Sequence, residues 1–362
     1  MGRSLRFTAG ASAVLAVVLA LAGCSTGALA PPSSSATSTS ASPSPTPKPT
    51  PTPTPTPTPM PVPTPEPTPP PADPVDALTG GPVNEGPVIA VKVDNTSAGL
   101  PQYGLADADI TYVEQVEGGL TRLMPIFHTT LADDVGPVRS VRTTDAELLP
   151  AFGVPALVFS GGGGIPLAAI AATPVIQVAE EQGAGGFWRG RGTAPYNLHS
   201  DLTKVQANTT GLSPARNIGM SFAAIEPRVE AAPAADQVTV QFQAARMGWG
   251  WTGSNYQVYR ESSPLSDAGG TSVVADNVLI QHVDFEPDGE VDSVGSPSYI
   301  SHTVGSGSFE LYRDGKVLTG TWSRSAPDQI FQFVDGAGTP VPFKPGKTWV
   351  ALVPGTATVS TS

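Results

Sequence analysis

A tract that alternates proline with threonine or serine most limits what this chain can fold into. It reads "PSPTPKPTPTPTPTPTPMPVPTPEPTPPP" over residues 43–71, and 19 of the 40 prolines lie between Pro31 and Pro74. Proline has no backbone N–H and fixes φ, so this tract cannot join a hydrogen-bonded helix or sheet. We therefore predict that residues 24–86 form a disordered, extended linker, and that the folded part begins at about residue 87.

The segment before the linker has the three parts of a bacterial lipoprotein signal. Arg3 and Arg6 give a positive start, the apolar run "FTAGASAVLAVVLALA" follows, and "LAGC" ends at Cys24, the only cysteine. The apolar run is too short for a convincing membrane-spanning helix. We predict that residues 1–23 are removed and that a lipid on Cys24 anchors the protein to the extracytoplasmic face of the cell membrane. The alternative is an ordinary secretory signal with an incidental cysteine.

The net charge of the chain limits its partners. The charge is −12 for the whole chain, and it becomes −14 once residues 1–23, with two arginines and no acidic residue, are removed. An acidic surface repels polyanions, so nucleic acid is not expected as a partner. Besides the membrane reached by the lipid on Cys24, the expected partner is a cell-envelope ligand or another protein.

Downstream of the linker, the hydrophobic pattern predicts an α+β protein in two segments. Residues 87–230 combine strands such as "PVIAVKVDN" with short helices, which is typical of a mixed α/β domain. Residues 236–356 contain repeated strand patterns and a hairpin signal at Asp314-Gly315, which favour a mostly antiparallel β domain packed against the first. The stretch near residues 226–236, rich in alanine and proline, is the expected boundary.

The arginines of the first segment are the main clue to a binding site. Arg139 and Arg142 lie in "GPVRSVRTTDAE", where a strand gives way to a helix, and Arg122 lies upstream in "EGGLTRLMPIF". Guanidinium groups bind carboxylate or phosphate through two parallel hydrogen bonds. We predict that the three arginines face a common cleft and hold such an anion. The alternative for Arg139 and Arg142 is a structural ion pair with Asp145, Glu147 or Glu117.

Glu114 is the fourth residue of the predicted site. The segment "DITYVEQVEGGLTRLMPIFHTT" predicts two strands joined at Gly118-Gly119. A three-residue loop there would put Glu114 opposite Met124 and diagonal to Arg122 on one face of the hairpin. We therefore predict that Glu114 orients Arg122. The alternative is a buried ion pair that only fixes the register of the hairpin.

A helix and then a glycine loop are predicted after Arg142. "TDAE", residues 144–147, has capping-box spacing, so a short helix should run to about Phe152 and stop at Gly153. "PALVFSGGGGIPLAA" then predicts a strand, a glycine loop at Gly161–Gly164 and a small helix. The loop lacks the spacing and the GK[ST] ending of nucleotide-binding loops, and its role is left open.

No enzyme motif identifies a reaction. The sequence has no G-x-S-x-G elbow, no H-E-x-x-H pair and no cysteine after Cys24. Its few histidines do not make a metal site, so neither a metal nor a cofactor is expected, and no catalytic residue is assigned. We favour a protein that binds a small anionic or glycan envelope ligand or a protein partner. A hydrolase or transferase acting on cell-envelope glycan and a scaffold without a small ligand are the alternatives.

Taken together, these segments resemble the YerB-like lipoproteins, a bacterial family of unknown function. In the first segment the likeness rests on "VKVDNTSAGLPQYGLADADITYVEQVEGGLTR" and "GPVRSVR". In the second it rests on "YQVYRESSPLSDAGG", "DNVLIQHV", "VGSGSFELYRDGKVLTGTW" and "FKPGKTWVALVP". The resemblance covers roughly residues 87–354. It implies an N-terminal α/β part, a C-terminal β part and a place in the cell envelope, and it implies no reaction.

Overall fold

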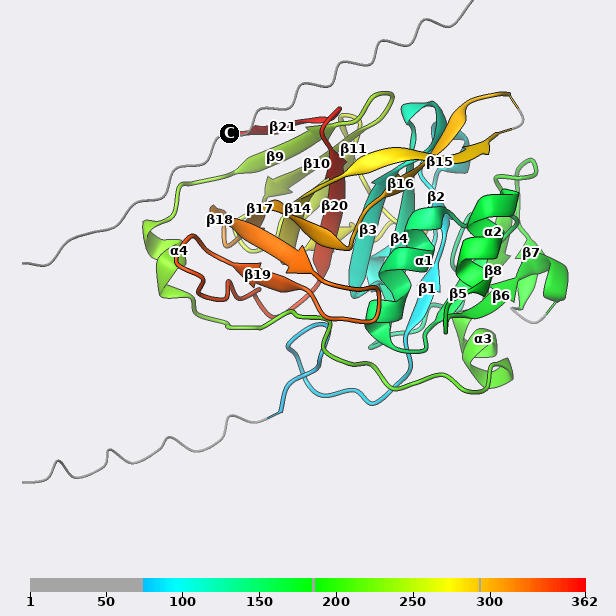
Figure 1. Cartoon of the computed structure of the whole chain (residues 1–362), viewed down its shortest axis with the longest axis horizontal. Helices are drawn as coiled ribbons and strands as arrows, with labels where there is room; N and C mark the ends of the chain where they lie inside the picture. The colour runs from blue at the N-terminus through cyan, green and yellow to red at the C-terminus, as the bar shows by residue number, and fades with distance from the viewer. Residues whose placement is uncertain (1–73, 184–185, 293) are drawn as a thin grey trace, which may run out of the picture. The chain divides into compact units, whose positions relative to one another are not determined.

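The computed structural model describes residues 74–183, 186–292 and 294–362 (Figure 1). The predicted signal segment, Cys24 and the linker up to residue 73 lie outside these residues. Residues 74–86, which the composition places in the linker, belong to the folded part. Leu78 is fully buried there, and Asp76 Oδ2 lies 2.9 Å from His128 Nε2. The folded part therefore begins upstream of residue 87.

An eleven-stranded mixed sheet connects the two predicted segments. β20, from the second segment, pairs in parallel with β3, from the first. β14 with β20, β1 with β5, and β5 with β6 are also parallel pairs. In spatial order the strands are β19 (Gln332–Val334), β18 (Lys316–Arg324), β17 (Gly305–Arg313), β14 (Asn277–Val283), β20 (Thr348–Pro354), β3 (Ile110–Gln115), β4 (Thr121–Phe127), β1 (Ile89–Val91), β5 (Ala156–Phe159) and β6 (Ile176–Ala179), with β2 (Val93–Asp94) also paired to β4.

A second, antiparallel sheet packs on one face of this large sheet. Its strands alternate buried and exposed residues: Val238 and Val240 face the core, while Thr239 and Gln241 face outward. The strands are β12 (Ser263–Pro264), β11 (Tyr256–Arg260), β10 (Arg246–Trp251), β9 (Gln237–Gln241) and β21 (Thr358–Thr361), with β13 (Val274–Ala275) paired to β11.

Four α-helices and five short 3₁₀ helices complete the described part, together with two separate two-stranded sheets. The α-helices are α1 (Thr143–Leu148), α2 (Gly164–Ala171), α3 (Leu202–Asn208) and α4 (Pro227–Ala231). The 3₁₀ helices are Ser97–Gly99, Leu105–Asp107, Glu117–Gly119, Leu149–Phe152 and Glu180–Gln182. The two-stranded sheets are β7 (Phe187–Arg189) with β8 (Leu198–Ser200), and β15 (Phe285–Val291) with β16 (Pro297–Ser301).

Alternate residues of the large sheet point into two cores on its opposite faces. Val113 and Leu123 belong to the core shared with the second sheet. Tyr112 and Met124 belong to the other core, which also contains Leu148 of α1. The described part is therefore α+β and mostly sheet, with the large sheet as its middle layer. Because of this alternation, the even-numbered residues Glu114 and Arg122 lie on the side of the sheet that faces α1.

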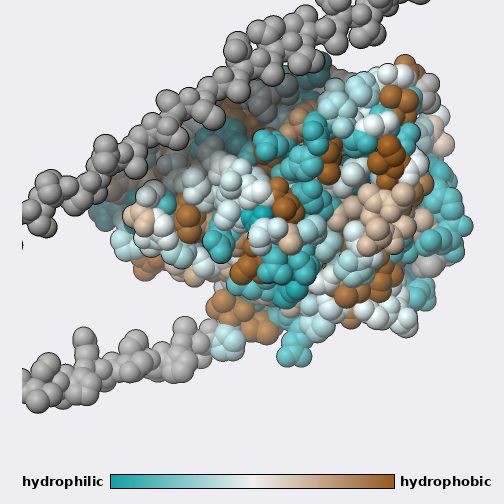
Figure 2. Space-filling view, in the orientation of Figure 1, coloured by the Kyte–Doolittle hydropathy of each residue, from teal (hydrophilic) through white to brown (hydrophobic). Residues whose placement is uncertain are grey.

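The described surface is mixed in polarity. Figure 2 shows hydrophobic and hydrophilic residues intermingled on the face that it draws. Within residues 74–183, 186–292 and 294–362, no helix has the length and apolar character needed to cross a membrane.

Candidate functional site

The β3–β4 hairpin carries two of the predicted residues, and its register differs from the expected one. Glu114 pairs directly with Arg122, and Tyr112 pairs with Met124. The connection is longer than three residues because Glu117–Gly119 form a 3₁₀ turn between the strands. The expected register is wrong by two residues. A shift of two residues preserves the faces, so Glu114 and Arg122 still share one face.

Glu114 contacts a lysine rather than Arg122. Lys92 Nζ donates to Glu114 Oε1 and lies 2.8 Å from Asp145 Oδ1. All three side chains are buried, and Lys92 has no exposed surface. Burial raises the pKa of Asp145 to about 6, and the charge of Lys92 opposes that rise. The prediction that Glu114 orients Arg122 is therefore corrected: Glu114 holds Lys92. The sequence reasoning missed this lysine, although its place inside the apolar run "PVIAVKVDN" is a signal for a buried pair.

Helix α1 fixes Asp145 beside Lys92. The N–H of Arg142 donates to Asp145 Oδ2 at 2.8 Å, so the capping interaction begins at Arg142 and not at residue 144 as expected. The helix then tightens into the 3₁₀ turn Leu149–Phe152 and ends at Gly153, whose φ is 91°. The expected end of the helix is confirmed. Its N-cap is Arg142, two residues before the expected Thr144.

Arg139 and Arg142 each pair with one carboxylate. Arg139 Nη1 donates to Asp94 Oδ2, and the Arg139 guanidinium lies 4.8 Å from the centre of the Tyr196 ring. Arg142 Nη2 donates to Glu117 Oε2 at 2.6 Å. Burial raises the pKa of Glu117, but the Arg142 charge and hydrogen bond outweigh burial, so this pKa is lowered. Arg142 thus forms a structural ion pair with Glu117, which is one of the alternatives given above. Arg139 pairs with Asp94, which was not among the predicted partners.

Arg122 has no such partner. Only 7% of its surface is exposed, and its Nε and Nη1 atoms have no hydrogen-bond partner among the described residues. Burial lowers the pKa of Arg122, and repulsion from Arg142 and Arg139 lowers it further, while the charges of Asp94 and Glu117 partly oppose this fall. Asp94, the partner of Arg139, lies opposite Arg122 in the pairing of β2 with β4, so the structure brings the arginines near one another. A buried cation without a partner is costly, so an anion beside Arg122 would be strongly stabilised.

The cluster lies at the carboxyl edge of the parallel strands, where open sheets commonly bind ligands. β2 ends at Asp94, β3 is followed by Glu117, and Ser160 and Glu180 follow β5 and β6. Ser160 Oγ donates to Glu180 Oε2 at 2.7 Å, and Glu180 Oε1 accepts a 2.7 Å hydrogen bond from Arg189. We call Arg122, Arg139 and Arg142, with Asp94 and Glu117, the arginine site.

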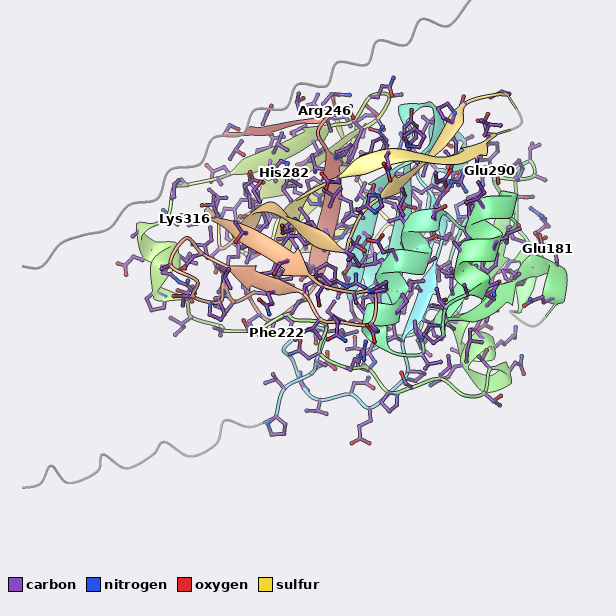
Figure 3. All side chains as sticks on the ribbon, viewed as in Figure 1. Glu181, Phe222, Arg246, His282, Glu290 and Lys316 are labelled. Atoms are coloured by element: carbon purple, nitrogen blue, oxygen red, sulfur yellow. The ribbon has the colours of Figure 1, made fainter. Side chains whose placement is uncertain are left out.

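The glycine loop Gly161–Gly164 runs beside the arginine site. Ser160 N–H donates to the carbonyl of Arg139 at 2.9 Å, and Val141 N–H donates to the carbonyl of Gly161 at 3.1 Å. These two hydrogen bonds hold the loop against the segment that carries Arg139 and Arg142. The loop also receives the β15–β16 hairpin, which we call the arm: Glu290 of the arm lies beside α2 (Figure 3).

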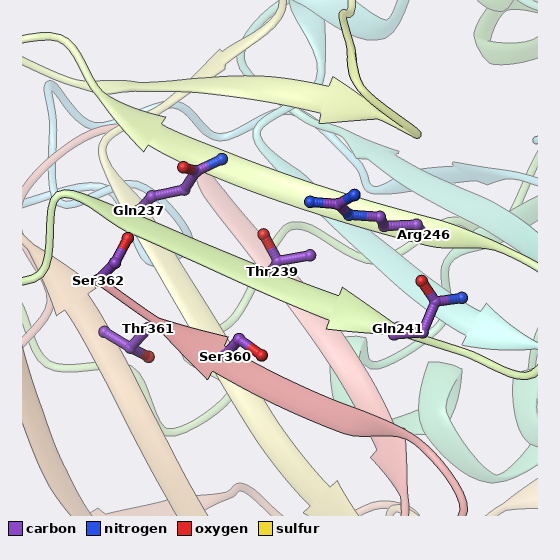
Figure 4. Close-up of a pocket in the computed structure, with 7 residues that line it drawn as sticks. All are labelled: Gln237, Thr239, Gln241, Arg246, Ser360, Thr361 and Ser362. Atoms are coloured by element: carbon purple, nitrogen blue, oxygen red, sulfur yellow. The ribbon is translucent and has the colours of Figure 1, made fainter.

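A polar cavity of about 340 Å³ lies elsewhere, on the outer face of the second sheet (Figure 4). Gln237, Thr239, Gln241 and Ser360 line it, and the Arg246 side chain has no ion pair among the described residues. Arg246 is half-buried, whereas Arg122 is buried. The arginine site is therefore the stronger candidate, because an unpartnered cation is costly only where water is excluded.

At the foot of the arm, His302 joins it to α1 and gives a testable pH dependence. His302 Nδ1 lies 3.1 Å from Glu147 Oε2, and Nε2 lies 3.2 Å from Glu286 Oε1. Partial burial lowers the pKa of His302, but the hydrogen bonds to both carboxylates raise it more. A raised pKa stabilises the fold fully below about pH 6.5, and this contribution is lost as the pH rises through the folded pKa. The stability difference between the wild type and His302→Gln should therefore shrink with rising pH in urea unfolding. A difference that is constant from about pH 5 to about pH 8 would contradict this assignment.

The fold and the cluster together define an α+β protein with a buried arginine at the carboxyl edge of a mixed sheet. The family model described as "Protein of unknown function (DUF3048) N-terminal domain" matches residues 78–215, and the corresponding C-terminal domain model matches residues 238–350. The chain therefore belongs to the YerB-like family of proteins with these two domains, as the sequence resemblance predicts.

Two comparisons, one of sequence and one of fold, show similarity to the same relative from Bacillus subtilis. "Putative lipoprotein YerB" of Bacillus subtilis (strain 168) is 43% identical over 60 residues, which span 17% of this chain and 18% of that protein. The crystal structure of YerB protein from Bacillus subtilis has a similar fold, with a TM-score of 0.65 and 21% identity. That similarity covers 79% of this chain and 99% of the other.

Proposed function

We propose that this protein binds a small anion, a carboxylate or a phosphate, through Arg122, Arg139 and Arg142. The observation that carries the proposal is Arg122, a buried cation with two nitrogens that have no partner among the described residues. An anion would give hydrogen bonds to those nitrogens and would neutralise a charge that burial makes costly. Arg142 Nε, also buried and without a partner there, is a further donor. The expected ligands are anionic envelope components, including glycans that carry such groups.

A scaffold without a small ligand is the second candidate, and the other charges favour it. Lys92, Arg139 and Arg142 each have a carboxylate partner, which is what a purely structural network requires. Binding of acetate, sulfate and fractionated envelope components to the mature chain separates the two candidates. Saturable binding supports the anion site, and its absence from every fraction supports the scaffold. Turnover of a fraction in the same assay would instead favour an enzyme.

We also infer that the protein is anchored to the extracytoplasmic face of the cell membrane through a lipid on Cys24. The signal pattern supports this inference, and so does the name of the Bacillus subtilis relative, which describes a lipoprotein. The proline-rich linker would hold the folded part away from the membrane. At about 3.1 Å per residue, such a chain spans well over 100 Å when extended, on the order of three domain diameters.

Replacing Cys24 with serine should release the protein from the membrane. The thiol is the only group in the signal that can take up the diacylglyceryl chains, and each buried methylene contributes about 0.8 kcal/mol to anchoring. Fractionation and acyl-chain labelling of cells measure both effects. Ser33→Ala, a matched change in the linker, should leave both unchanged. Normal labelling and membrane retention of Cys24→Ser would refute the anchor.

A further inference from the structure

The arm, β15 with β16, forms a two-stranded sheet of its own. It contacts β3, α1 and α2, and Figure 1 shows it extending toward α2. β16 also contacts the 3₁₀ turn Glu117–Gly119. That turn carries Glu117, the partner of Arg142. The arm therefore lies beside the end of the arginine site that carries Glu117, without joining the large sheet.

Two carboxylates of the arm make its links to the helices. Asp288 Oδ2 accepts hydrogen bonds from Thr143 Oγ1 at 2.6 Å and from Ser298 Oγ at 3.1 Å. Glu290 Oε2 accepts a hydrogen bond from the N–H of Ile165 at 2.9 Å. Neither carboxylate has a cation within ion-pair distance among the described residues. The arm thus carries two negative charges that no described cation neutralises, and such charges repel an anion that approaches them.

The glycine loop is shaped to receive Glu290. A Cβ atom at Gly163 would lie 2.5 Å from Glu290 Cγ, which is closer than real carbon atoms approach. The absence of a side chain at Gly163 therefore leaves room for Glu290 in this position, and the partial positive charge at the start of α2 stabilises the carboxylate. This contact suggests a role for the loop Gly161–Gly164, which is to hold the carboxylate of Glu290.

We propose that the arm is a gate for the arginine site. The gate is closed when Asp288 and Glu290 accept their hydrogen bonds from Thr143 and Ile165. It is open when an anion is bound. This inference rests on the proposed function, because the gate matters only if Arg122 binds a ligand. In the closed state Arg122 is buried and has free donors, so it is ready for an anion but shielded from solvent. The two arm carboxylates repel an incoming anion, so anion binding favours the open state, in which these carboxylates have moved away.

Removing the carboxylates should tighten anion binding. Asp288→Asn combined with Glu290→Gln weakens the closed state and removes the repulsion, so the affinity for sulfate should rise at least about fivefold in calorimetric titration. Sulfate is the probe because it keeps its double charge across the working pH range. Glu85→Gln combined with Glu230→Gln removes two exposed acids that have no ion pair among the described residues, so it is the matched control for net charge and should leave the affinity unchanged.

Locking the arm tests the same gate in the opposite direction. In a Cys24→Ser background, Gly163→Cys with Glu290→Cys places two thiols where Glu290 Cγ lies 2.5 Å from the Gly163 Cβ position, within disulfide reach. The oxidised protein should bind sulfate at least about tenfold more weakly than the same protein after reduction. The reduced protein is its own control for folding and for both substitutions.

Three results would overturn the gate. Equal sulfate affinity of the oxidised and reduced forms would show that access does not require the arm to move. Failure of the disulfide to form under oxidant would show that the arm does not approach Gly163. Unchanged affinity after removal of both carboxylates would exclude their repulsion. If sulfate and acetate bind neither the wild type nor any variant, the proposed anion site itself fails, and the gate fails with it.

Discussion

Replacing Lys92 with methionine should lower the free energy of unfolding by about 3–5 kcal/mol. Lys92 has no exposed surface and is the shared cation of two buried carboxylates, Glu114 and Asp145. Methionine fills a similar volume, so packing is largely kept and the loss reports on charge. Without the lysine, two carboxylates remain buried next to each other, and each must be desolvated without a partner or protonated. Urea unfolding of the mature chain at neutral pH measures the change.

Two variants separate this charge effect from a general cost of substitution. Lys316→Met removes a lysine whose Nζ donates, among the described residues, only to the carbonyl of Ala232, and it should cost less than about 1 kcal/mol. The triple variant Lys92→Met, Glu114→Gln, Asp145→Asn should recover much of the lost stability, because it removes the unpaired charges. A single Lys92→Met variant as stable as the wild type would contradict the buried network.

Local patterns predict the parts of this site that depend on neighbouring residues. The alternation of the β3–β4 hairpin places Glu114 and Arg122 on one face, and the structure agrees. Gly153 ends the helical segment, as a glycine with positive φ at a helix end does. The concentration of three arginines in an acidic chain predicts that they gather, and their mutual repulsion lowers the pKa of Arg122.

Features that depend on distant parts of the chain could not be predicted in this way. The hairpin register depends on a 3₁₀ turn of Glu117–Gly119, which a glycine pair does not distinguish from a tighter loop. The pairing of Lys92 with Asp145 is fixed by α1, which lies over the sheet only after both layers have formed. The parallel pairing of β20 with β3 joins strands from opposite ends of the folded part, and parallel pairing leaves no local turn signal.

Arg122→Met should abolish anion binding while leaving the fold intact. Loss of one charged partner in a buried site costs about 2–5 kcal/mol of affinity, which is roughly a 30- to 4,000-fold weaker complex. The free energy of unfolding should stay unchanged or rise, because methionine replaces a buried guanidinium whose Nε and Nη1 have no partner among the described residues. Sulfate titration and urea unfolding of the same preparations measure both quantities.

The combination of these two results distinguishes a binding residue from a structural one. Arg191→Met is the matched control, since Arg191 is exposed and should change neither affinity nor stability by more than about 0.5 kcal/mol. Arg142→Met differs from both, because it leaves the partly buried Glu117 without its cation and should lower stability as well as affinity. If Arg122→Met instead destabilises the fold and leaves sulfate binding intact, Arg122 is structural and the arginine site is not a ligand site. A buried cation retained without a partner is expected where a ligand supplies the missing charge, and this pair of measurements tests that expectation directly.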